Sequence, residues 1–332
     1  MNRMLYVALR SVYRKVRPYR PESWYYQTRY RAVYHRYCNF RNPKRFSEKL
    51  FHRMRYPERV FSYLADKEAV RDYIANVVGE RYLVPLISVH DHIDETVIDS
   101  LPSAFVMKSN HSCSQVKIVT DKAQEDPAAL IRLATEWLNS DYSIRGGEKH
   151  YSAIKPKILF EQPLLSAGLP PDDYKVYHFN PSAPGGPGRK APSYALIQHI
   201  QGRFESPSQV FYTASWEKMD LKRRGESNAG VSPRPDNLEE MLDLSEKLSK
   251  GLGFLRVDFY VYQGRLYIGE LTLTPVAGRG TFDPESWDRI FGEKFGWPED
   301  VSDIEAVFGL TPVKRSPHTA APKLTDRQNA SP

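Results

Sequence analysis

Several residues and motifs that carry common kinds of protein chemistry are scarce or missing in this sequence of 332 residues. The two cysteines, Cys38 and Cys113, lie far apart without CxxC spacing, which argues against a disulfide framework and against a cysteine zinc site. The nine histidines are scattered without metal-ligand spacing. A Walker sequence and a GxGxxG fingerprint are also missing, so the classes of enzyme that depend on these motifs are not indicated.

Long apolar runs are absent as well. The run MLYVAL near the start is interrupted by Arg10, which leaves it too short for a membrane-spanning helix of about 20 residues and too weak for a signal-peptide core. Hydrophobic residues make up 41% of the chain and charged residues 26%, as in ordinary globular proteins with enough apolar material for a core. We therefore expect a cytoplasmic globular protein.

Acidic residues are scarce in the first 55 positions. This segment holds 15 Lys and Arg against Glu22 and Glu48, a net charge of +13, whereas the whole chain carries +7. It also holds eight tyrosines, and basic residues interleaved with aromatic ones suit an anionic membrane surface or a nucleic-acid backbone. Because no nucleic-acid motif is present, we favour the membrane surface and expect no nucleic-acid partner. A solvated basic packing helix is the alternative interpretation.

The hydrophobic pattern divides the rest of the chain into helices and strands. Apolar residues at intervals of three and four predict helices over 46–56, 66–79, 126–140 and 237–253. Short β-branched or apolar runs predict strands over 82–91, 103–111, 115–121, 155–165, 173–180 and 193–200, and a hairpin over 255–275. The segment 181–192, rich in Pro and Gly, is predicted to be a loop, and 311–332 a disordered tail.

Two carboxylates in the predicted hairpin are candidates for a metal site. If the loop has three residues (263–265), Asp258 faces Glu270 on one side of the sheet, whereas a two-residue loop would place them on opposite sides. Facing carboxylates repel each other unless a cation lies between them, and Mg²⁺ is usually held by one or two carboxylates together with substrate phosphates. Arg256 and Thr272 share the predicted face, where the arginine can contact phosphate. The alternative is an exposed hairpin with ordinary surface charges.

Four further positions are candidates for contacts with a nucleotide. Lys108 ends a predicted strand and enters a short polar loop, and the backbone N–H groups of such a loop can hold a polyphosphate together with the lysine. Lys67 lies at a helix start, and Glu161 ends a strand, where it can act as a hinge acid near a nucleotide. Lys175 lies on an alternating strand and can face either side of its sheet. Ordinary surface charges would explain the four positions equally well.

Eight segments of the chain, in the same order, resemble the TupA-like ATP-grasp family of surface-polysaccharide biosynthesis proteins. They are NPKRFSEKL, DKEAVRDYI, GERYLVPLI, LPSAFVMKSNH, ILFEQPLL, DYKVYHFN, RVDFYVYQGRLYIGELTLTP and GRGTFDPESWD. The similarity extends from about Tyr37 to about Pro298. It implies an α+β ATP-grasp fold, in which two lobes with antiparallel sheets hold ATP between them.

The resemblance also implies a division of the chain. A basic, aromatic and helical segment over 1–36 would precede an ATP-grasp domain over 37–310. Within that domain, a lid lobe would cover about 82–160 and a metal lobe about 161–310.

Roles for individual residues follow from the same resemblance. Lys67 and Lys108 are similar to the two phosphate-contacting lysines. The loop 109–115 is similar to the flexible phosphate lid, and its cofactor-binding candidates are Ser109, Ser112 and Ser114. The segment that resembles the interlobe hinge, which binds adenine through backbone groups, contains Glu161, Gln162 and Leu164. Lys175 completes the cofactor-binding candidates.

The metal and catalytic roles fall on the hairpin and on one lysine. Asp258 and Glu270 are similar to the metal acids, with Thr272 at the position where many ATP-grasp proteins have Asn. Arg256 is similar to the phosphate-side arginine, and with Lys108 it is expected to be catalytic.

For activity, the resemblance implies ATP-dependent ligation of a carboxylate to an amine through an acyl phosphate, with ATP and Mg²⁺ as cofactors. The expected carboxylate belongs to a uronic acid or similar unit of an acidic surface glycan or its lipid-linked precursor, and the expected amine to an amino acid. The basic segment would hold the enzyme peripherally at the anionic inner face of the plasma membrane. Two alternatives stay open: a glycosyltransferase, although its usual DxD motif is missing, and a non-catalytic ATP-grasp scaffold that binds nucleotide.

Overall fold

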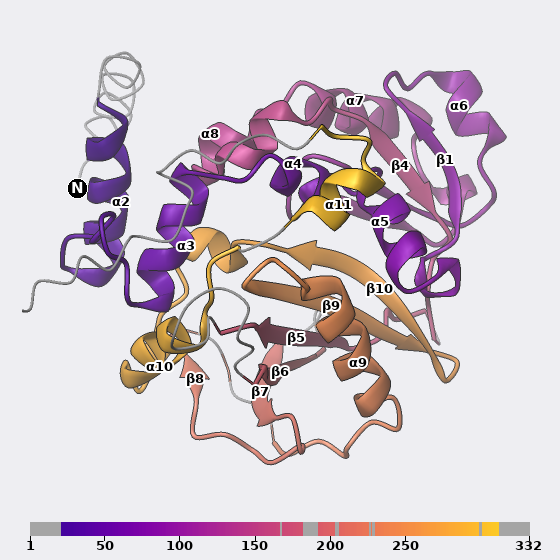
Figure 1. The fold of residues 1–332 in the computed structure, drawn as a ribbon. Coiled ribbons are helices and arrows are strands. Elements are labelled where there is room, and N and C mark those ends of the chain that lie inside the picture. The colour runs from indigo at the N-terminus through magenta and orange to yellow at the C-terminus, as the bar shows by residue number, and fades with distance from the viewer. Residues whose placement is uncertain are drawn as a thin grey trace, which may run out of the picture.

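Two separate antiparallel sheets form the framework of the molecule, and helices pack against both (Figure 1). The computed structural model describes residues 21–166, 168–181, 192–202, 206–225, 227, 230–298 and 301–311. Three predicted features therefore lie wholly or mostly outside the described residues. They are the first 20 residues of the basic segment, the Pro- and Gly-rich loop, and the C-terminal tail.

The first sheet has four short strands in the order β1-β4-β2-β3. These are β1 (Leu86–His90), β2 (Phe105–Ser109), β3 (Val116–Val119) and β4 (Ile158–Glu161). Helix α7 (Pro127–Leu138) begins where the side chain of Asp126 accepts a hydrogen bond from the backbone N of Ala128, as N-cap residues commonly do. Its apolar face packs against the sheet, where Leu130 and Trp137 share a core with Phe160.

The second sheet has five strands in the order β10-β9-β5-β6-β7. These are β5 (Asp173–Phe179), β6 (Tyr194–Gln201), β7 (Ser208–Thr213), β9 (Phe254–Tyr262) and β10 (Arg265–Thr272). Helix α9 (Leu238–Ser249) covers one face, where Met241 and Leu248 share a core with Val257. The other face is apolar at one end, around Phe46 of α3 (Phe46–Arg55), and carries the charged residues described below at the other.

The N-terminal helices form an apolar cluster with one another, and the second of them packs against the five-stranded sheet. Helix α2 (Glu22–Tyr34) agrees with the helical character expected for the basic segment. In α3, Arg53 is buried and donates hydrogen bonds at 2.7–3.2 Å to the carbonyl oxygens of Leu252, Phe254 and Leu273. This side chain therefore anchors α3 to the ends of β9 and β10.

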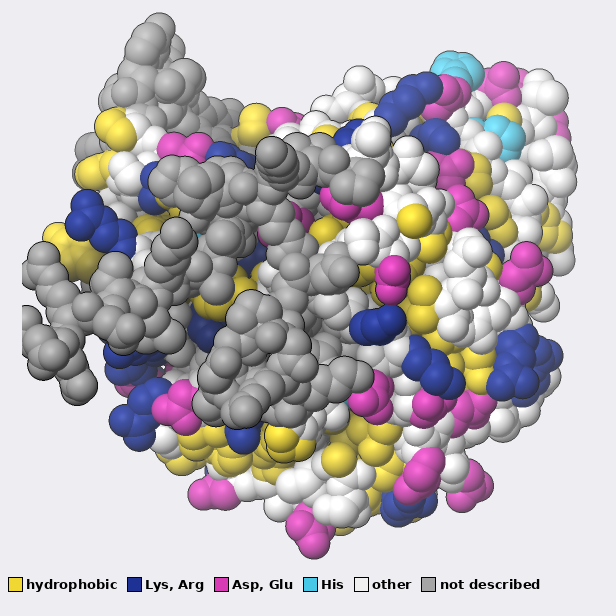
Figure 2. All heavy atoms as spheres, in the orientation of Figure 1, with side chains coloured by type: hydrophobic (Ala, Val, Ile, Leu, Met, Phe, Trp, Pro, Cys, Tyr) yellow, Lys and Arg dark blue, Asp and Glu magenta, His cyan; other side chains and the backbone are white. Residues whose placement is uncertain are grey.

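Shorter elements complete the fold. They are α4 (Val60–Ala65), α5 (Val70–Val77), α6 (Glu95–Ser100), α8 (Tyr142–Gly146), α10 (Ser286–Lys294), α11 (Ser302–Val307), and the paired strands β8 (Lys222–Arg223) and β11 (Phe282–Asp283). On the face shown in Figure 2, the Lys and Arg side chains of the described residues lie among Asp and Glu side chains. Within the described ranges, no helix combines the length and the apolar character needed to cross a membrane.

Candidate active site

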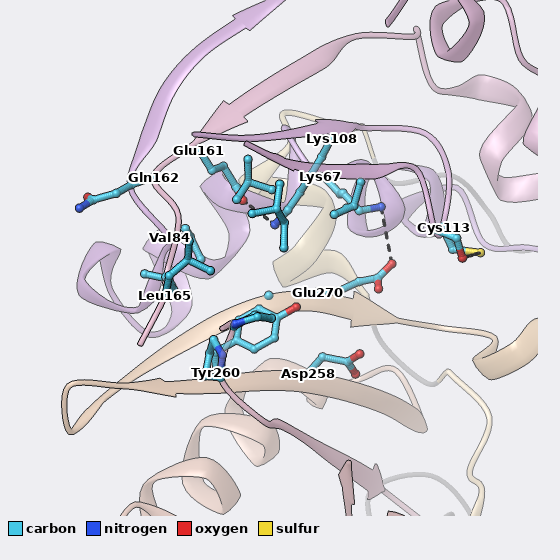
Figure 3. A pocket seen from close by; sticks show the side chains of 18 residues that line it. Lys67, Val84, Lys108, Cys113, Glu161, Gln162, Leu165, Asp258, Tyr260 and Glu270 are labelled. Atoms are coloured by element: carbon cyan, nitrogen blue, oxygen red, sulfur yellow. Dashed lines mark hydrogen bonds and ion pairs between the residues drawn. The ribbon is translucent and has the colours of Figure 1, made fainter. Parts of the chain in front are cut away.

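A cavity of about 300 Å³ lies between the two sheets. Figure 3 shows Lys67 and Lys108 on its upper side and Asp258 and Glu270 on the β9–β10 hairpin below. The cavity brings together eight of the residues predicted from the sequence: Lys67, Lys108, Ser114, Glu161, Gln162, Leu164, Asp258 and Glu270. The other five predicted site residues, Ser109, Ser112, Lys175, Arg256 and Thr272, do not line it.

The hairpin reaches the predicted pairing of carboxylates by a different route. Of the two loop lengths that the sequence left open, the structure has the two-residue loop, since Arg265 pairs directly with Tyr262. A register shift between Ile268 and Glu270 then adds one residue to β10, and Glu270 faces Asp258 after all. The predicted pairing is therefore confirmed, because the β-bulge compensates for the shorter loop.

Gly269 lies at this bulge, where Tyr260 leaves no room for a side chain. A Cβ atom at this position would lie 2.4 Å from Cε2 of Tyr260, which is closer than any side chain tolerates. Tyr260 lies two residues after Asp258 on the same face of β9, and its ring lines the cavity (Figure 3). Sequence alternation could have indicated Tyr260, whereas a glycine within a strand only hints at a bulge.

Asp258 is held by two cations that lie beside the cavity. Its carboxylate accepts hydrogen bonds from Nε and Nη2 of Arg256 at 2.6 and 2.8 Å and from Nζ of Lys175 at 2.5 Å. Burial by itself would raise the pKa of Asp258, but Arg256 and Lys175 outweigh it and hold the pKa below its usual value. Asp258 is therefore a stable carboxylate, although only 3% of its surface is exposed.

These contacts show where three further predicted residues lie, and their assigned roles stay predictions. Lys175 faces the same side of the sheet as Asp258, and its ammonium group binds that carboxylate and not the cavity. The guanidinium of Arg256 binds Asp258 and also donates to the hydroxyl of Thr272 at 2.9 Å. The buried carboxylate of Asp258 is thus neutralised by Lys175 and Arg256. Thr272 contributes indirectly, because its hydroxyl accepts a hydrogen bond from Arg256.

On the opposite wall, each lysine is paired with an acid. Nζ of Lys108 lies 2.5 Å from Glu161, and an Arg71 nitrogen lies 3.4 Å from the same carboxylate. Burial by itself would lower the pKa of Lys108, but the charge of Glu161 outweighs it and raises the pKa. Nζ of Lys67 lies 3.6 Å from Glu270 and donates to the carbonyl oxygen of Ser112. Arg71 was not predicted, although its position four residues after Lys67 in one helical segment was a usable signal.

Hydrogen bonds connect residues of the loop between β2 and β3 with one another and with Ser140. The hydroxyls of Ser109 and Ser112 both donate to Oε1 of Gln115 at 2.6 Å, and Nε2 of Gln115 donates to the hydroxyl of Ser140. Ser109 and Ser112 are buried in this network and do not line the cavity, and their assignment to the cofactor stays a prediction. The tip of the loop, with Ser114 at a φ of 68°, is the part that reaches the cavity.

The predicted hinge forms an apolar end of the cavity. The backbone N of Gln162 donates to the carbonyl oxygen of Pro85 at 2.9 Å, which joins the end of β4 to the segment before β1. Leu164 packs with Val84 and Tyr267 in a small apolar cluster. An apolar lining with a few convergent polar groups is typical of pockets that bind small molecules.

The donor set of the hairpin fits a hard divalent cation. Asp258 and Glu270 present oxygen ligands on neighbouring strands, and both line the cavity. In the part of the chain that the structure describes, no group of three or more His, Cys, Asp or Glu gathers as a complete metal site. Two carboxylates completed by phosphate oxygens are a usual arrangement for Mg²⁺, so the residues present are compatible with it.

Comparisons with known proteins give one family and several similar solved structures. A family model described as TupA-like ATPgrasp matches residues 48–296. The search among curated proteins found no match. Among solved structures, the chain is similar to D-alanine–D-alanine ligase from Bacillus anthracis complexed with ATP, at 17% identity and a TM-score of 0.41, over 74% of this chain and 67% of that chain.

Two further solved structures are similar to the chain. The ligase of the same name from Helicobacter pylori shares 14% identity, with a TM-score of 0.36, over 69% of this chain and 59% of that chain. Phosphoribosylamine–glycine ligase from Thermotoga maritima shares 14% identity, with a TM-score of 0.38, over 72% of this chain and 56% of that chain. The chain thus spans less than two thirds of the length of these two proteins.

Proposed function

Because this chain belongs to the TupA-like ATP-grasp family, we propose that it is an ATP-dependent ligase that joins a carboxylate to an amine. One observation carries the proposal: a cavity between two antiparallel sheets has Lys67 and Lys108 on one wall and the facing carboxylates Asp258 and Glu270 on the other. Positive side chains on one side and metal-binding oxygens on the other suit a metal-bound polyphosphate.

In the proposed reaction, a carboxylate oxygen of the acceptor attacks the γ-phosphorus of ATP, and the bond to ADP breaks to leave an acyl phosphate. The amine then attacks the acyl carbon, phosphate leaves, and the nitrogen releases a proton. Phosphoryl transfer depends mainly on positioning and charge neutralisation, so no protein nucleophile is needed. Lys67 and Lys108 supply positive charge to the phosphates, while Arg256 and Lys175 keep Asp258 ionised and in place.

Mg²⁺ belongs to the same proposal. Asp258 and Glu270 would hold it, and the bound ion would neutralise phosphate charge during transfer. Lys67 now forms an ion pair with Glu270 at 3.6 Å, which keeps the acid oriented toward the cavity. We expect this lysine to contact phosphate when nucleotide is bound.

The proposed acceptor is a uronic acid or similar unit of an acidic surface glycan or of its lipid-linked precursor, and the proposed amine is that of an amino acid. Support comes from the family, whose similarity covers most of the chain. We further propose that the enzyme works in the cytoplasm, at the inner face of the plasma membrane. Six of the 15 basic residues of the N-terminal segment lie among residues 1–20, which contain no acid.

A thermal-shift experiment tests the nucleotide site. With Mg²⁺ and ATP, the unfolding midpoint of the wild-type protein should rise, since a ligand at 100 times its Kd adds about 2.7 kcal/mol to stability. Lys108→Ala and Glu270→Gln should abolish the rise. Lys155→Ala is a matched control, because Lys155 pairs with Asp91 at the surface and does not line the cavity.

Turnover separates the proposed ligase from the alternatives. ADP release that needs both a uronic acid and an amino acid would support ligation. A midpoint that rises with UDP-glucose and not with ATP would instead favour a glycosyltransferase. Nucleotide binding without ADP release for any pair of a carboxylate and an amine would indicate a non-catalytic scaffold.

A further inference from the structure

Asn110 lies where three segments meet behind the lysine wall of the cavity. These segments are the turn that leads into α5, the loop after β2, and the stretch that enters β4. Asn110 is completely buried and does not line the cavity. A buried polar side chain is stable only when its hydrogen-bonding groups are satisfied, so its partners indicate what it holds together.

The side chain of Asn110 uses both its donor and its acceptor groups. Nδ2 donates to Oδ1 of Asp66 at 3.0 Å and to the carbonyl oxygen of Lys155 at 2.9 Å. Oδ1 accepts from the backbone N of Lys157 at 2.7 Å. The backbone of Asn110 is also engaged, since its N donates to the carbonyl oxygen of Lys157 and its O accepts from the N of Lys67. One residue thus joins all three segments.

Two of these contacts fix the position of Lys67. Its backbone N is bound to the carbonyl oxygen of Asn110 at 3.1 Å, and its neighbour Asp66 is bound to the Asn110 side chain. The ammonium group of Lys67 donates to the carbonyl oxygen of Ser112, two residues after Asn110, and lies 3.6 Å from Glu270. The backbone and the ammonium group of Lys67 therefore both bind the segment 110–112, which Asn110 anchors.

We propose that Asn110 is a positioning residue that fixes Lys67 for contact with the phosphates of ATP. The inference rests on the proposed function and adds a residue that touches no substrate. An amide is required at this position, because Asp would lose both N–H donors and place a second carboxylate 3.0 Å from Asp66. Leu, of similar size, would make none of the hydrogen bonds that the amide makes with Asp66, Lys155 and Lys157.

A double-mutant cycle tests whether Asn110 acts through Lys67. The Kd for Mg-ATP is measured by calorimetry for the wild type, Asn110→Ala, Lys67→Ala and the double variant. Each single change should weaken binding about tenfold or more, and the double variant should bind no more weakly than Lys67→Ala alone. Multiplied effects in the double variant would overturn the proposal.

Asn180→Ala is a matched control. Its side chain is partly buried and donates to the carbonyl oxygen and the hydroxyl of Ser249 at 2.9 and 3.0 Å, outside the cavity. This variant should lower the unfolding midpoint and leave the Kd for Mg-ATP unchanged. If Asn110→Ala behaved in the same way, with a lower midpoint and an unchanged Kd, Asn110 would have a structural role alone.

If Asn110→Ala does not fold, an exchange of the amide and the carboxylate between Asn110 and Asp66 tests the same proposal. Asn110→Asp should weaken Mg-ATP binding, and adding Asp66→Asn should restore a donor facing an acceptor and recover part of the affinity. A recovered midpoint without recovered affinity would overturn the proposal. Failure of the wild type to bind Mg-ATP would overturn the proposed function as well, whereas wild-type binding with unaffected Asn110 variants would overturn the role of Asn110 alone.

Discussion

Glu148 is a buried acid close to the candidate site. Its carboxylate accepts a hydrogen bond from the hydroxyl of Thr274, just beyond the end of β10. Burial raises its pKa from 4.5 to about 7; the Thr274 hydrogen bond opposes this rise, and the charge of Glu270 adds to it. Between these two pH values, the folded protein keeps a proton on Glu148 that the unfolded chain has lost. Stability must therefore fall as the pH rises through this window and level off above about pH 7.

We expect Glu148→Gln to remove this component of the pH dependence. The amide keeps an oxygen that can accept from Thr274 and carries no charge at any pH. A shift from 4.5 to about 7 corresponds to about 3 kcal/mol, so the variant should gain roughly this much relative to the wild type between pH 4.5 and pH 8. Urea unfolding of both proteins at pH 4.5 and at pH 8 measures this difference in the free energy of unfolding. Parallel losses in the two proteins would contradict the prediction, and Glu217→Gln, at an exposed position, is the control.

Ion pairing explains how so many charges are tolerated around one cavity. Lys108 is paired with Glu161, Lys67 with Glu270, and Asp258 with Arg256 and Lys175. Every one of these side chains has a partner of opposite sign before any ligand arrives. When a nucleotide binds with its metal ion, these side chains would exchange their present partners for the ligand. Such an exchange costs less free energy than burying unpaired charges.

At the scale of elements, the β9–β10 hairpin depends on its bulge. The loop residues Gln263 and Gly264 both have positive φ, at 50° and 74°, as the tight two-residue turn requires. With this loop and a regular ladder, Glu270 would point away from Asp258. The extra residue at Gly269 brings the acid back to the cavity side.

Gly269→Ala should therefore affect both stability and nucleotide binding. The new methyl group would meet the ring of Tyr260 at 2.4 Å, and relief of this contact requires movement of β10 or of the ring. We expect a loss of about 1–3 kcal/mol of stability and a smaller midpoint rise with Mg-ATP.

Two further variants make this prediction specific. Adding Tyr260→Ala removes the obstructing ring and should restore part of the stability. Gly230→Ala has nothing within 4 Å of the new Cβ atom and should be close to neutral. A neutral Gly269→Ala would contradict the role given to the bulge.

At the scale of the whole molecule, the cavity exists because two sheets meet along one side. A bridge between Leu83 and Ile268 joins the segment before β1 to β10, and α4 contacts the same strand. The division of the chain near residue 160 stays a prediction. The described strands before Glu161 belong to the first sheet, and the strands from Asp173 to Thr272 that form the larger sheet follow it.

The basic residues of positions 1–55 are expected to act at this scale too. Several of its described cations are engaged within the protein: Arg29 with the carbonyl oxygen of Gly146, Arg36 with Glu285, and Arg55 with Glu22. Any attraction to a membrane must then depend largely on the six basic residues among positions 1–20.

Deleting residues 1–20 should abolish binding to anionic vesicles and leave nucleotide binding intact. Six cations at about 1 kcal/mol each contribute up to about 6 kcal/mol at such a surface. Flotation with vesicles that contain phosphatidylglycerol, compared with phosphatidylcholine alone, measures the first effect. The midpoint rise with Mg-ATP is the control. Equal flotation of the deleted and complete chains would contradict the assignment of membrane binding to this segment.

Local pattern was sufficient for much of this protein. The predicted helices over 46–56, 126–140 and 237–253 correspond to α3, α7 and α9, because amphipathic spacing reports the face that a helix buries. The order of eight short segments indicated the family, which the family model confirms. The same order led to Lys67, Lys108, Glu161, Asp258 and Glu270, all of which line one cavity.

Local pattern could not predict where each polar side chain lies and which groups it contacts. Ser109 and Ser112 have the same chemistry as Ser114, yet two are buried with Gln115 and one reaches the cavity. Lys175 was equally able to face either side of β5 until its pairing with β9 was known. The side of Lys175 depends on Asp258, 83 positions away in the chain, and the fate of the serines depends on how the loop folds around Gln115, so spacing within one segment encodes neither.

The sequence by itself determined the elements, their order and the chemical types available to the site, because these depend on composition and on periodicity along the chain. The tertiary structure decided which of those residues meet. The bulge at Gly269 turned Glu270 toward Asp258, Arg256 and Lys175 were drawn to a buried carboxylate, and Asn110 tied Lys67 to two distant segments. Each of these depends on burial and on contacts between strands and turns far apart in the chain, which exist only once the two sheets have packed together.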